Sequence, residues 1–280
     1  MRDNEKSAAS APVEQKHAED EAVPTRPLKM QLELLEKTPH SGTDIMSFKF
    51  SRGNFEGGKL QQQKQQDHYF NYRAGQYAVV DLGTKQDPEG PVRSFTLASS
   101  PTEENFILIS TRIRDTPFKK KLAGLDNGSS VKITAPLGKF VLHEDYSKPA
   151  IFLSGGIGVT PFRSMIKYAT DKKLSIKIIM FDANRDNDNI LYKNEFDQYA
   201  NLNKNLKIVY TLDVSDDNWK GERGHINQSM LTKYLTTSEM DNSMFYVCGP
   251  PGMLNAIQRL LKEELHLPNE RITVEEFTGY

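Results

Sequence analysis

A glycine-rich segment follows a short apolar stretch near the middle of the chain. Residues 154–161 read SGGIGVTP. Glycines there permit a tight turn and close backbone approach, and the free N–H groups of a following helix favour a pyrophosphate. Pro161 stands where the dinucleotide-binding pattern G-x-G-x-x-G has its third glycine, although proline is a good first helical residue. Alone, the segment fits a phosphate site and, almost equally well, a structural turn.

Two further segments combine polar and apolar residues in patterns that suit a ligand. The first reads RSFT at 93–96; Arg93 offers a bidentate fork to phosphate, and the hydroxyl groups can hydrogen-bond a heteroaromatic ring. The second reads VCGPPGM at 247–253, at the end of a predicted strand, where parallel sheets bind ligands. Taken singly, Arg93 also fits an edge strand in solvent, and Cys248 an inert buried side chain.

The composition excludes several classes of protein. Among 280 residues, 36 Lys and Arg balance 37 Asp and Glu, which leaves no electrostatic footprint for nucleic acid. One cysteine cannot form an internal disulfide, a thiolate zinc site or an iron–sulfur cluster alone. We therefore expect no metal site and a reducing, cytoplasmic setting. No segment reads as a signal peptide or approaches the ~20 apolar residues that span a bilayer, so we expect no membrane contact. We also expect a monomer.

The elements that must position these motifs fall into two differently patterned halves. Residues 28–146 read as short β-branched and aromatic strands bounded by Gly, Pro and Asn, at the spacing of a small antiparallel barrel. Over 147–280 apolar strands alternate with helices, which predicts a doubly wound parallel sheet. Residues 1–27 predict a disordered tail, and the glutamine-rich stretch 57–67 predicts an exposed loop.

The order and spacing of the motifs are more specific than any one of them. An Arg-x-Phe-Thr in the barrel, a Gly-Gly-x-Gly-x-Thr-Pro at the change of pattern, a Cys-Gly-Pro-Pro-Gly-Met before the last helix and a terminal Glu-x-Phe together resemble the ferredoxin–NADP reductase superfamily. The resemblance covers residues 28–280. It implies an FAD-binding β-barrel domain at 28–146, followed at 147–280 by an α/β domain that binds NADH or NADPH.

In the first half the resemblance implies a flavin site. Arg93 would hold the flavin pyrophosphate, Phe95 would stack beside the flavin or its ribityl chain, and Thr96 would hydrogen-bond near the flavin N5. Thr116 fits the residue that caps a second flavin-phosphate helix. The cofactor-binding residues predicted in this half are Tyr77, Arg93, Ser94, Phe95, Thr96, Thr111 and Thr116.

In the second half the resemblance implies the dinucleotide site. Cys248 would lie close to the position of hydride transfer, and Glu275 matches the family's terminal glutamate. Either Phe277 or Tyr280 would cover the flavin until nicotinamide displaces it. The predicted catalytic residues are Thr96, Cys248 and Glu275; the predicted dinucleotide or flavin contacts are Gly155, Gly156, Gly158, Thr160, Pro161, Arg185, Asp213, Gly249, Pro250, Met253 and Phe277.

The choice of nicotinamide rests on one acidic stretch. Asp213, in TLDVSDD at 211–217, is similar to the NADH-using cytochrome b5 reductase branch, whereas Arg185 could meet the 2′-phosphate of NADPH. We expect NADH. The implied reaction is hydride transfer to the flavin followed by single-electron transfer, with the protein setting alignment and excluding water.

The acceptor must lie outside the chain, because one cysteine holds no cluster. We expect ferredoxin or another iron–sulfur protein, with an oxygenase, a haem protein or a quinone-type molecule as alternatives. The lysine run 119–121 predicts either a ferredoxin docking patch or a solvated surface. From another functional class, a flavin-binding redox regulator without sustained turnover is the competing hypothesis.

Overall fold

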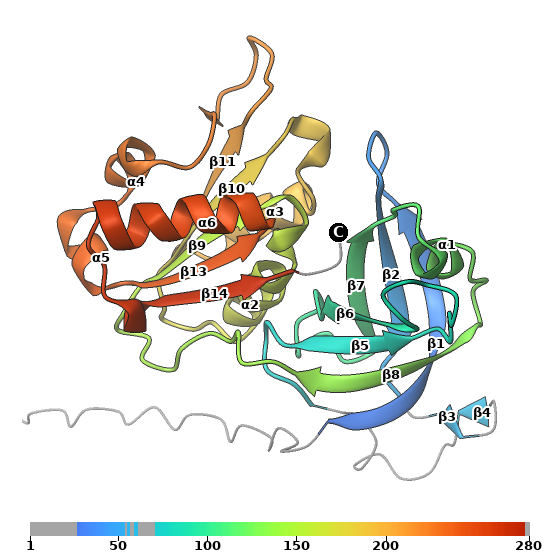
Figure 1. Ribbon diagram of the computed structural model, residues 1–280. Coiled ribbons are helices and arrows are strands. Elements are labelled where there is room, and N and C mark those ends of the chain that lie inside the picture. The colour runs from blue at the N-terminus through green and yellow to red at the C-terminus, as the bar shows by residue number, and fades with distance from the viewer. Residues whose placement is uncertain (1–26, 54, 57–58, 61–70, 278–280) are drawn as a thin grey trace, which may run out of the picture.

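Two six-stranded sheets make up the computed structural model (Figure 1). The structure describes residues 27–53, 55–56, 59–60 and 71–277. Residues 1–26 of the predicted tail, most of the glutamine-rich stretch and Tyr280 lie outside the described residues. Among the described helices, none is long and apolar enough to cross a membrane.

The first sheet is antiparallel and nearly closes into a barrel. Its strand order is β6-β5-β8-β1-β2-β7, and the backbone N–H of Ala98, just after β6, donates to the Leu108 carbonyl of β7 at 2.7 Å. The two edges therefore approach each other. Its strands are β1 (Leu28–Pro39), β2 (Ile45–Ser51), β5 (Tyr77–Asp81), β6 (Val92–Thr96), β7 (Phe106–Arg112) and β8 (Ser130–Leu137). A short hairpin, β3 (Phe55–Glu56) with β4 (Lys59–Leu60), and one helix, α1 (Pro117–Ala123), complete this half.

Alternation along the strands explains why this sheet forms. In β1 the side chains of Met30, Leu32 and Leu34 are buried while their neighbours face outward, as expected for a strand with one face on the core. They pack with Phe48, Phe50 and the other members of one apolar cluster inside the sheet.

The second sheet is parallel, with strand order β12-β11-β10-β9-β13-β14. All six residues of β9 and all but one of β10 are buried, because helices cover both faces. Its strands are β9 (Ala150–Gly155), β10 (Ile178–Asn184), β11 (Leu206–Leu212), β12 (Glu222–Arg223), β13 (Met244–Gly249) and β14 (Ile272–Glu276). Its helices are α2 (Thr160–Asp171), α3 (Lys193–Leu202), α4 (Gln228–Tyr234), α5 (Thr237–Asn242) and α6 (Pro251–Arg259), with short turns of other pitch at Gly156–Val159, Asn187–Asn189, Leu260–Glu264 and Asn269–Arg271.

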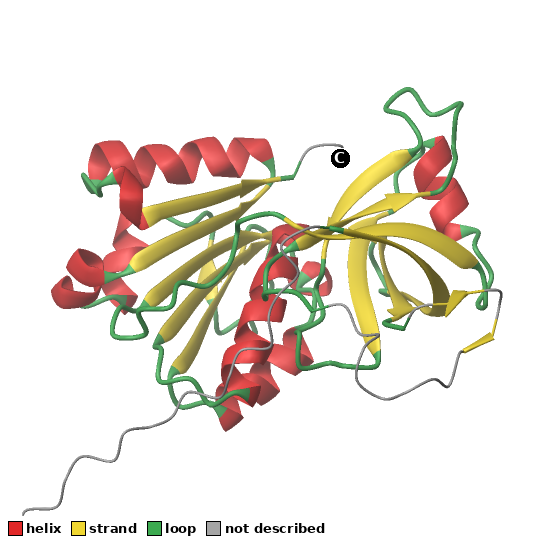
Figure 2. Cartoon of the chain, turned by 90° about the horizontal axis from the view of Figure 1, so that it is seen from below, coloured by secondary structure: helices red, strands yellow, loops and turns green. Residues whose placement is uncertain are grey.

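The helices divide between the two faces of the parallel sheet (Figures 1 and 2). Helices α4 and α6 pack on one face. Helices α2 and α3 pack on the other, in a cluster that continues into the antiparallel half, where Phe140 contacts Phe162 with ring centroids 5.8 Å apart. The two halves thus share one apolar cluster.

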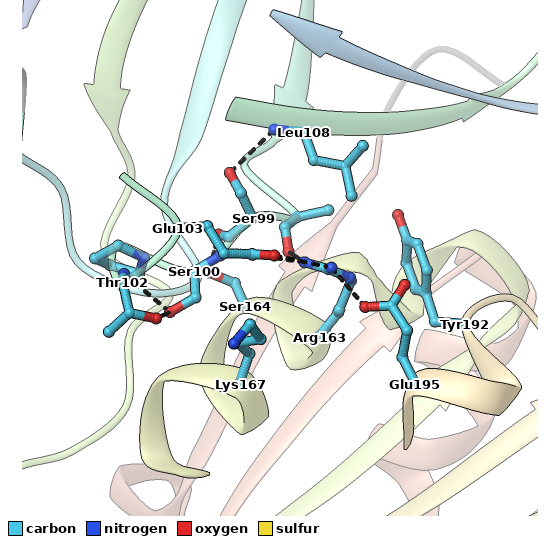
Figure 3. Close-up of polar contacts among 12 residues, drawn as sticks. Ser99, Ser100, Thr102, Glu103, Leu108, Arg163, Ser164, Lys167, Tyr192 and Glu195 are labelled. Atoms are coloured by element: carbon cyan, nitrogen blue, oxygen red, sulfur yellow. Dashed lines mark hydrogen bonds and ion pairs between the residues drawn. The ribbon is translucent and has the colours of Figure 1, made fainter. Parts of the chain in front are cut away.

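A buried polar cluster adds to this contact between the halves (Figure 3). Arg163 of α2 has 5% of its side chain exposed and pairs with Glu103, from the antiparallel half, and with Glu195 of α3. It also donates to the Ala98 carbonyl at 2.8 Å, and its guanidinium lies 5.1 Å from the ring centre of Tyr192. Burial opposes the charged form, but the Glu103 carboxylate raises the pKa of Arg163.

The predicted fold class, an antiparallel barrel followed by a doubly wound parallel sheet, is confirmed. Strand β8 ends at Leu137 and β9 begins at Ala150, while the domain boundary between 146 and 147 stays a prediction. The sequence interpretation missed α5. Its signal was the capping box at its start, in which Thr236 and Glu239 satisfy each other's backbone N–H groups.

Candidate functional site

The glycine turn lies where the order of the parallel sheet reverses. The chain leaves β9 toward β10 on one side, and β13 lies on the other, so the carboxyl ends of β9 and β13 flank a topological switch point. A Cβ on Gly155 would lie 2.2 Å from the sulfur of Met253, and one on Gly158 would lie 2.4 Å from the Cys248 carbonyl oxygen. Gly156 has a φ of +54°, which favours glycine. The two loops therefore touch at Gly155 and Gly158, and at Gly158 the facing backbone leaves no room for a side chain.

The turn leads directly into a long helix. Thr160 and Pro161 are buried in the first turn of α2, and the Thr160 hydroxyl donates to the Ile157 carbonyl at 3.1 Å. The predicted sequence Gly-x-Thr-Pro thus positions the helix start at the switch point. Gly249 ends β13, and Pro250 connects it to α6 at the corresponding position.

The same turn faces the antiparallel half. The nearest atom to a Cβ on Gly156 would be a terminal nitrogen of Arg112, at 3.6 Å. Arg112 ends β7, pairs with Asp44 and donates to Asn189 at 3.4 Å. A ligand seated on the glycine turn therefore lies beside the edge of the barrel.

Cys248 and Glu275 are neighbours on adjacent strands of the parallel sheet. Burial, and then the Glu275 charge, raise the pKa of the Cys248 thiol well above its usual value. Burial also raises the pKa of Glu275. The thiol is therefore neutral. Cys248 thus fits a role beside a hydride-transfer position from which water is excluded, and does not fit the role of a thiolate nucleophile.

Phe277 directly follows the end of β14 and packs against the apolar cluster that joins the two halves. In the barrel, Thr96 is 6% exposed and pairs in register with Tyr77. A Cβ on Gly138 would lie 2.8 Å from the ring of Tyr77, so the ring packs directly against this glycine. These predicted residues are thus fixed by strand pairing and packing, while the roles assigned to them stay predictions.

The carboxyl ends of β10 and β11 bring together the residues predicted to distinguish the nicotinamides. The Val214 N–H donates to the Arg185 carbonyl at 2.7 Å, which places Arg185 beside Asp213. The Arg185 side chain is 80% exposed. Asp213 is half exposed and lies 3.3 Å from His225. Both predicted residues are therefore accessible to a ligand.

A loop between β11 and β12 closes this end of the sheet. The indole N–H of Trp219 donates to the Glu222 carbonyl at 2.8 Å. A Cβ on Gly221 would lie 2.5 Å from the Trp219 ring, so the ring rests on a glycine.

Arg93, predicted to hold the flavin pyrophosphate, is buried on β6, against the loop that precedes this strand. It pairs with Asp87 and Glu89, and donates to the carbonyls of Glu89, Gly90 and Val92. Asp87 also accepts the Phe118 N–H at 2.8 Å. Asp87 was not predicted, and the sequence carries no signal for it beyond its place in a Pro- and Gly-containing turn.

Lys119 is a second buried cation beside this loop. It is 6% exposed, donates to the Thr111 hydroxyl, and lies 4.8 Å from the ring centre of Phe95. Its backbone N–H donates to the Thr116 side chain at 3.2 Å, so Thr116 caps α1 as expected. Lys119 is thus a buried cation against the barrel wall that fits the diphosphate of FAD, and the FAD-binding prediction is consistent with this half.

The lysine run 119–121 lies only partly on the surface. Lys119 is buried, Lys121 donates to the Leu82 carbonyl at 2.6 Å, and Lys120 pairs with Asp115. Only Lys119 turns into the barrel, while Lys120 and Lys121 are exposed, so the ferredoxin-docking interpretation of this run stays a prediction. Ser94, predicted as a cofactor contact, is exposed on β6.

A buried carboxylate lies one strand from the glycine turn. Asp182 of β10 is fully buried, accepts the Ser154 hydroxyl and accepts the Asn184 amide at 2.8 Å. Burial raises its pKa to about 6, against these hydrogen bonds. The sequence interpretation took this segment as an apolar strand and missed Asp182.

Comparison with known proteins agrees with this geometry. Residues 152–259 match the family model of the oxidoreductase NAD-binding domain. The chain is 29% identical over 221 residues to one subunit of the Na(+)-translocating NADH-quinone reductase of Idiomarina loihiensis, covering 72% of this chain and 52% of that protein. It is 30% identical to the corresponding protein of Yersinia pestis, covering 68% and 50%. The chain thus spans about half the length of the curated relatives it matches.

Solved structures share the fold. The Amycolatopsis cytochrome P450 reductase GcoB superposes with a TM-score of 0.72 at 20% identity, covering 90% of this chain and 71% of that one. The cytochrome b5 reductase domain of Ulva prolifera nitrate reductase gives 0.71 at 22% identity, covering 89% and 97%. A Neisseria gonorrhoeae ferredoxin NADP+ reductase with bound FAD and NADP gives 0.67 at 15% identity, covering 89% and 98%. The predicted resemblance to this superfamily is confirmed.

Proposed function

We propose, from the premise that the chain has the ferredoxin reductase-like fold and carries an oxidoreductase NAD-binding domain at 152–259, that it oxidises NADH and passes the electrons through FAD to a separate acceptor. The observation that carries the proposal is the meeting of the glycine turn with the barrel edge at Gly156 and Arg112. A dinucleotide on the turn and a flavin on the barrel would lie side by side there. When bound, FAD would accept a hydride and release electrons singly.

The chain's own residues would align the two cofactors and exclude water from the place where they meet. Gly155 and Gly158 let the two loops close on the dinucleotide, and the short helical turn Gly156–Val159 that leads into α2 offers its first N–H groups to the diphosphate. Cys248 and Thr96 are buried, and neither is ionised at neutral pH. Such surroundings exclude water from a hydride in transit.

We assign NADH as the electron donor. Asp213 is exposed at the end of β11, where its charge would repel the 2′-phosphate of NADPH. The relatives named above are NADH-quinone reductase subunits, which supports the same choice.

We infer that the acceptor lies outside these 280 residues. The chain has one cysteine, and the described residues contain no cluster of His, Cys, Asp or Glu that could hold a metal ion. Ferredoxin stays our first candidate. The similar proteins include a cytochrome P450 reductase, a subunit of an NADH-quinone reductase and the cytochrome b5 reductase domain of a nitrate reductase. They support testing a haem protein and a quinone beside ferredoxin.

The test is an anaerobic titration of the purified, flavin-loaded protein. NADH should bleach the flavin absorbance with one equivalent, NADPH should do so far more slowly, and an acceptor should restore the colour. A yellow protein that neither nucleotide bleaches would contradict the enzyme and favour the redox regulator. A colourless protein that binds no added FAD would contradict the flavin site itself.

A further inference from the structure

Arg93 has almost no hydrogen-bonding capacity left for a ligand. A guanidinium has five N–H donors. Its Nε faces Glu89 at 3.0 Å, Nη1 faces three backbone carbonyls, and Nη2 pairs with Asp87. At most one N–H therefore stays free, which is not enough for a bidentate fork on phosphate.

Asp87 is not easily displaced from this arrangement. Besides Arg93, it accepts the N–H of Glu89 at 3.0 Å and that of Phe118 at 2.8 Å. The residue is 5% exposed, so moving it would leave buried donors unpaired. Arg93 and Asp87 thus tie the loop before β6 to the first turn of α1, which is a structural task.

Lys119 has the capacity that Arg93 lacks. Its ammonium has three donors, and the contact with the Thr111 hydroxyl uses one. Among the described residues no carboxylate forms an ion pair with it. Burying an ammonium group without an anionic partner costs free energy. Lys119 therefore has two N–H donors and a full positive charge available for an anionic ligand.

The position of Lys119 is that of a flavin ligand. It bonds Thr111, covers the ring of Phe95 and follows the cap Thr116, three residues that the sequence placed around the cofactor. We propose that Lys119, rather than Arg93, supplies the charge that holds the diphosphate of FAD. This inference rests on the proposed function, because it needs FAD on this half of the chain.

The charges around Lys119 make its hold on an anion depend on pH. Burial, then the Arg93 charge, lower its pKa to about 8; Arg114 acts in the same direction and Glu89 in the opposite one. Below pH 8 the ammonium is present, and above it the free chain loses this charge. A diphosphate favours the charged form, so FAD binding should take up a proton near pH 8 to 9 and weaken as the pH rises.

The test compares FAD with riboflavin, which has no phosphate. Flavin is removed from the full chain, and each compound is titrated back by quenching of flavin fluorescence. In Lys119→Met the Kd for FAD should rise about tenfold or more, while the Kd for riboflavin stays at the wild-type value. Lys120→Met, which changes the exposed neighbour on the same helix, should leave both unchanged.

Other outcomes overturn the inference. An unchanged FAD affinity in Lys119→Met, or an equal loss for FAD and riboflavin, would show that Lys119 only packs. In Arg93→Met we expect lower thermal stability and an equal loss for both compounds; a loss confined to FAD would return the role to Arg93. Wild-type protein that binds neither compound would instead refute the proposed function.

A measurement on the wild-type chain decides the question if Lys119→Met does not fold. The Kd for FAD should rise about tenfold between pH 7 and pH 9.5, as expected for a group that loses its charge near pH 8. The Kd for riboflavin should not follow. Parallel curves for the two compounds would overturn the inference.

Discussion

The Nη1 atom of Arg163, in the helix that begins at the glycine turn, lies 2.9 Å from the carboxylate of Glu103 in the other half of the chain. Both side chains are largely buried, with 5% and 12% exposed. Because α2 carries Thr160 at its start and Arg163 one turn later, the pair fixes the dinucleotide turn relative to the barrel. We therefore expect the alignment of the two proposed ligands to depend on a contact outside both sites.

Removing this cation should destabilise the chain. Arg163→Met leaves the Glu103 carboxylate buried without its partner, and we expect a loss of about 3–5 kcal/mol in the free energy of unfolding, measured by urea denaturation. The control is Lys167→Met on the same helix, which removes a partly exposed pair with Asp171 and should cost about 0.5 kcal/mol. Equal losses in the two variants would show that the buried pair contributes no more than a surface pair.

A methyl group on the glycine turn should impair dinucleotide binding. In Gly158→Ala the new Cβ would lie 2.4 Å from the backbone of Cys248, so the loop after β13 must shift, at about 1–3 kcal/mol. We expect the KM for NADH to rise about tenfold in steady-state kinetics with an artificial acceptor. Gly252→Ala, where the Cβ meets nothing within 4 Å, should behave as wild type. An unchanged KM in a folded Gly158→Ala would place the dinucleotide elsewhere.

Removing the negative charge at the end of β11 should relax the choice of nicotinamide. Asp213→Asn keeps the side-chain shape but no longer repels a 2′-phosphate. We expect kcat/KM for NADPH to rise about tenfold, or ~1.4 kcal/mol, with little change for NADH. Asp241→Asn, on exposed α5, is the control for a general charge effect. If the ratio of kcat/KM for NADPH to kcat/KM for NADH does not change, Asp213 does not discriminate against the 2′-phosphate.

Asp182 should make the stability depend on pH. Burial raises its folded-state pKa to about 6, above its ordinary value of about 3.9, so the stability that the neutral form contributes is lost as the pH rises through 6. Asp182→Asn stays neutral and should be more stable than wild type at pH 8, by on the order of 2 kcal/mol. Urea unfolding at several values between pH 4.5 and pH 8 measures this, with Asp241→Asn as control. Curves of the same shape for wild type and Asp182→Asn would contradict the assignment.

The fold was predictable because hydrophobic period and turn residues agree along most of the chain. Alternation in β1 and unbroken apolar runs in β9 and β10 identify the two kinds of sheet. The glycine turn was predictable for the same local reason, since glycine spacing and the following helix are adjacent in sequence. Helix α5 was missed because its six residues carry no apolar stripe.

The charged residues of the site were less predictable, because their partners are distant in sequence. Nothing near Lys119 indicates that α1 turns it onto Phe95, and the surrounding lysine run favours a surface interpretation. Arg93 matched a family pattern, but its pairing with Asp87 depends on a loop conformation. Likewise Arg163 and Glu103 meet only when both halves have folded.

The loop that carries Trp219 has a practical consequence for measuring the reaction. Trp219 is the chain's one tryptophan, and it is held by Glu222 close to the strand end that bears Asp213. Its emission therefore reports from a single place at the adenosine end of the proposed dinucleotide site, at a wavelength separate from the visible absorbance band of the flavin. A stopped-flow trace read at two colours would time the arrival of the nucleotide separately from the reduction that follows it.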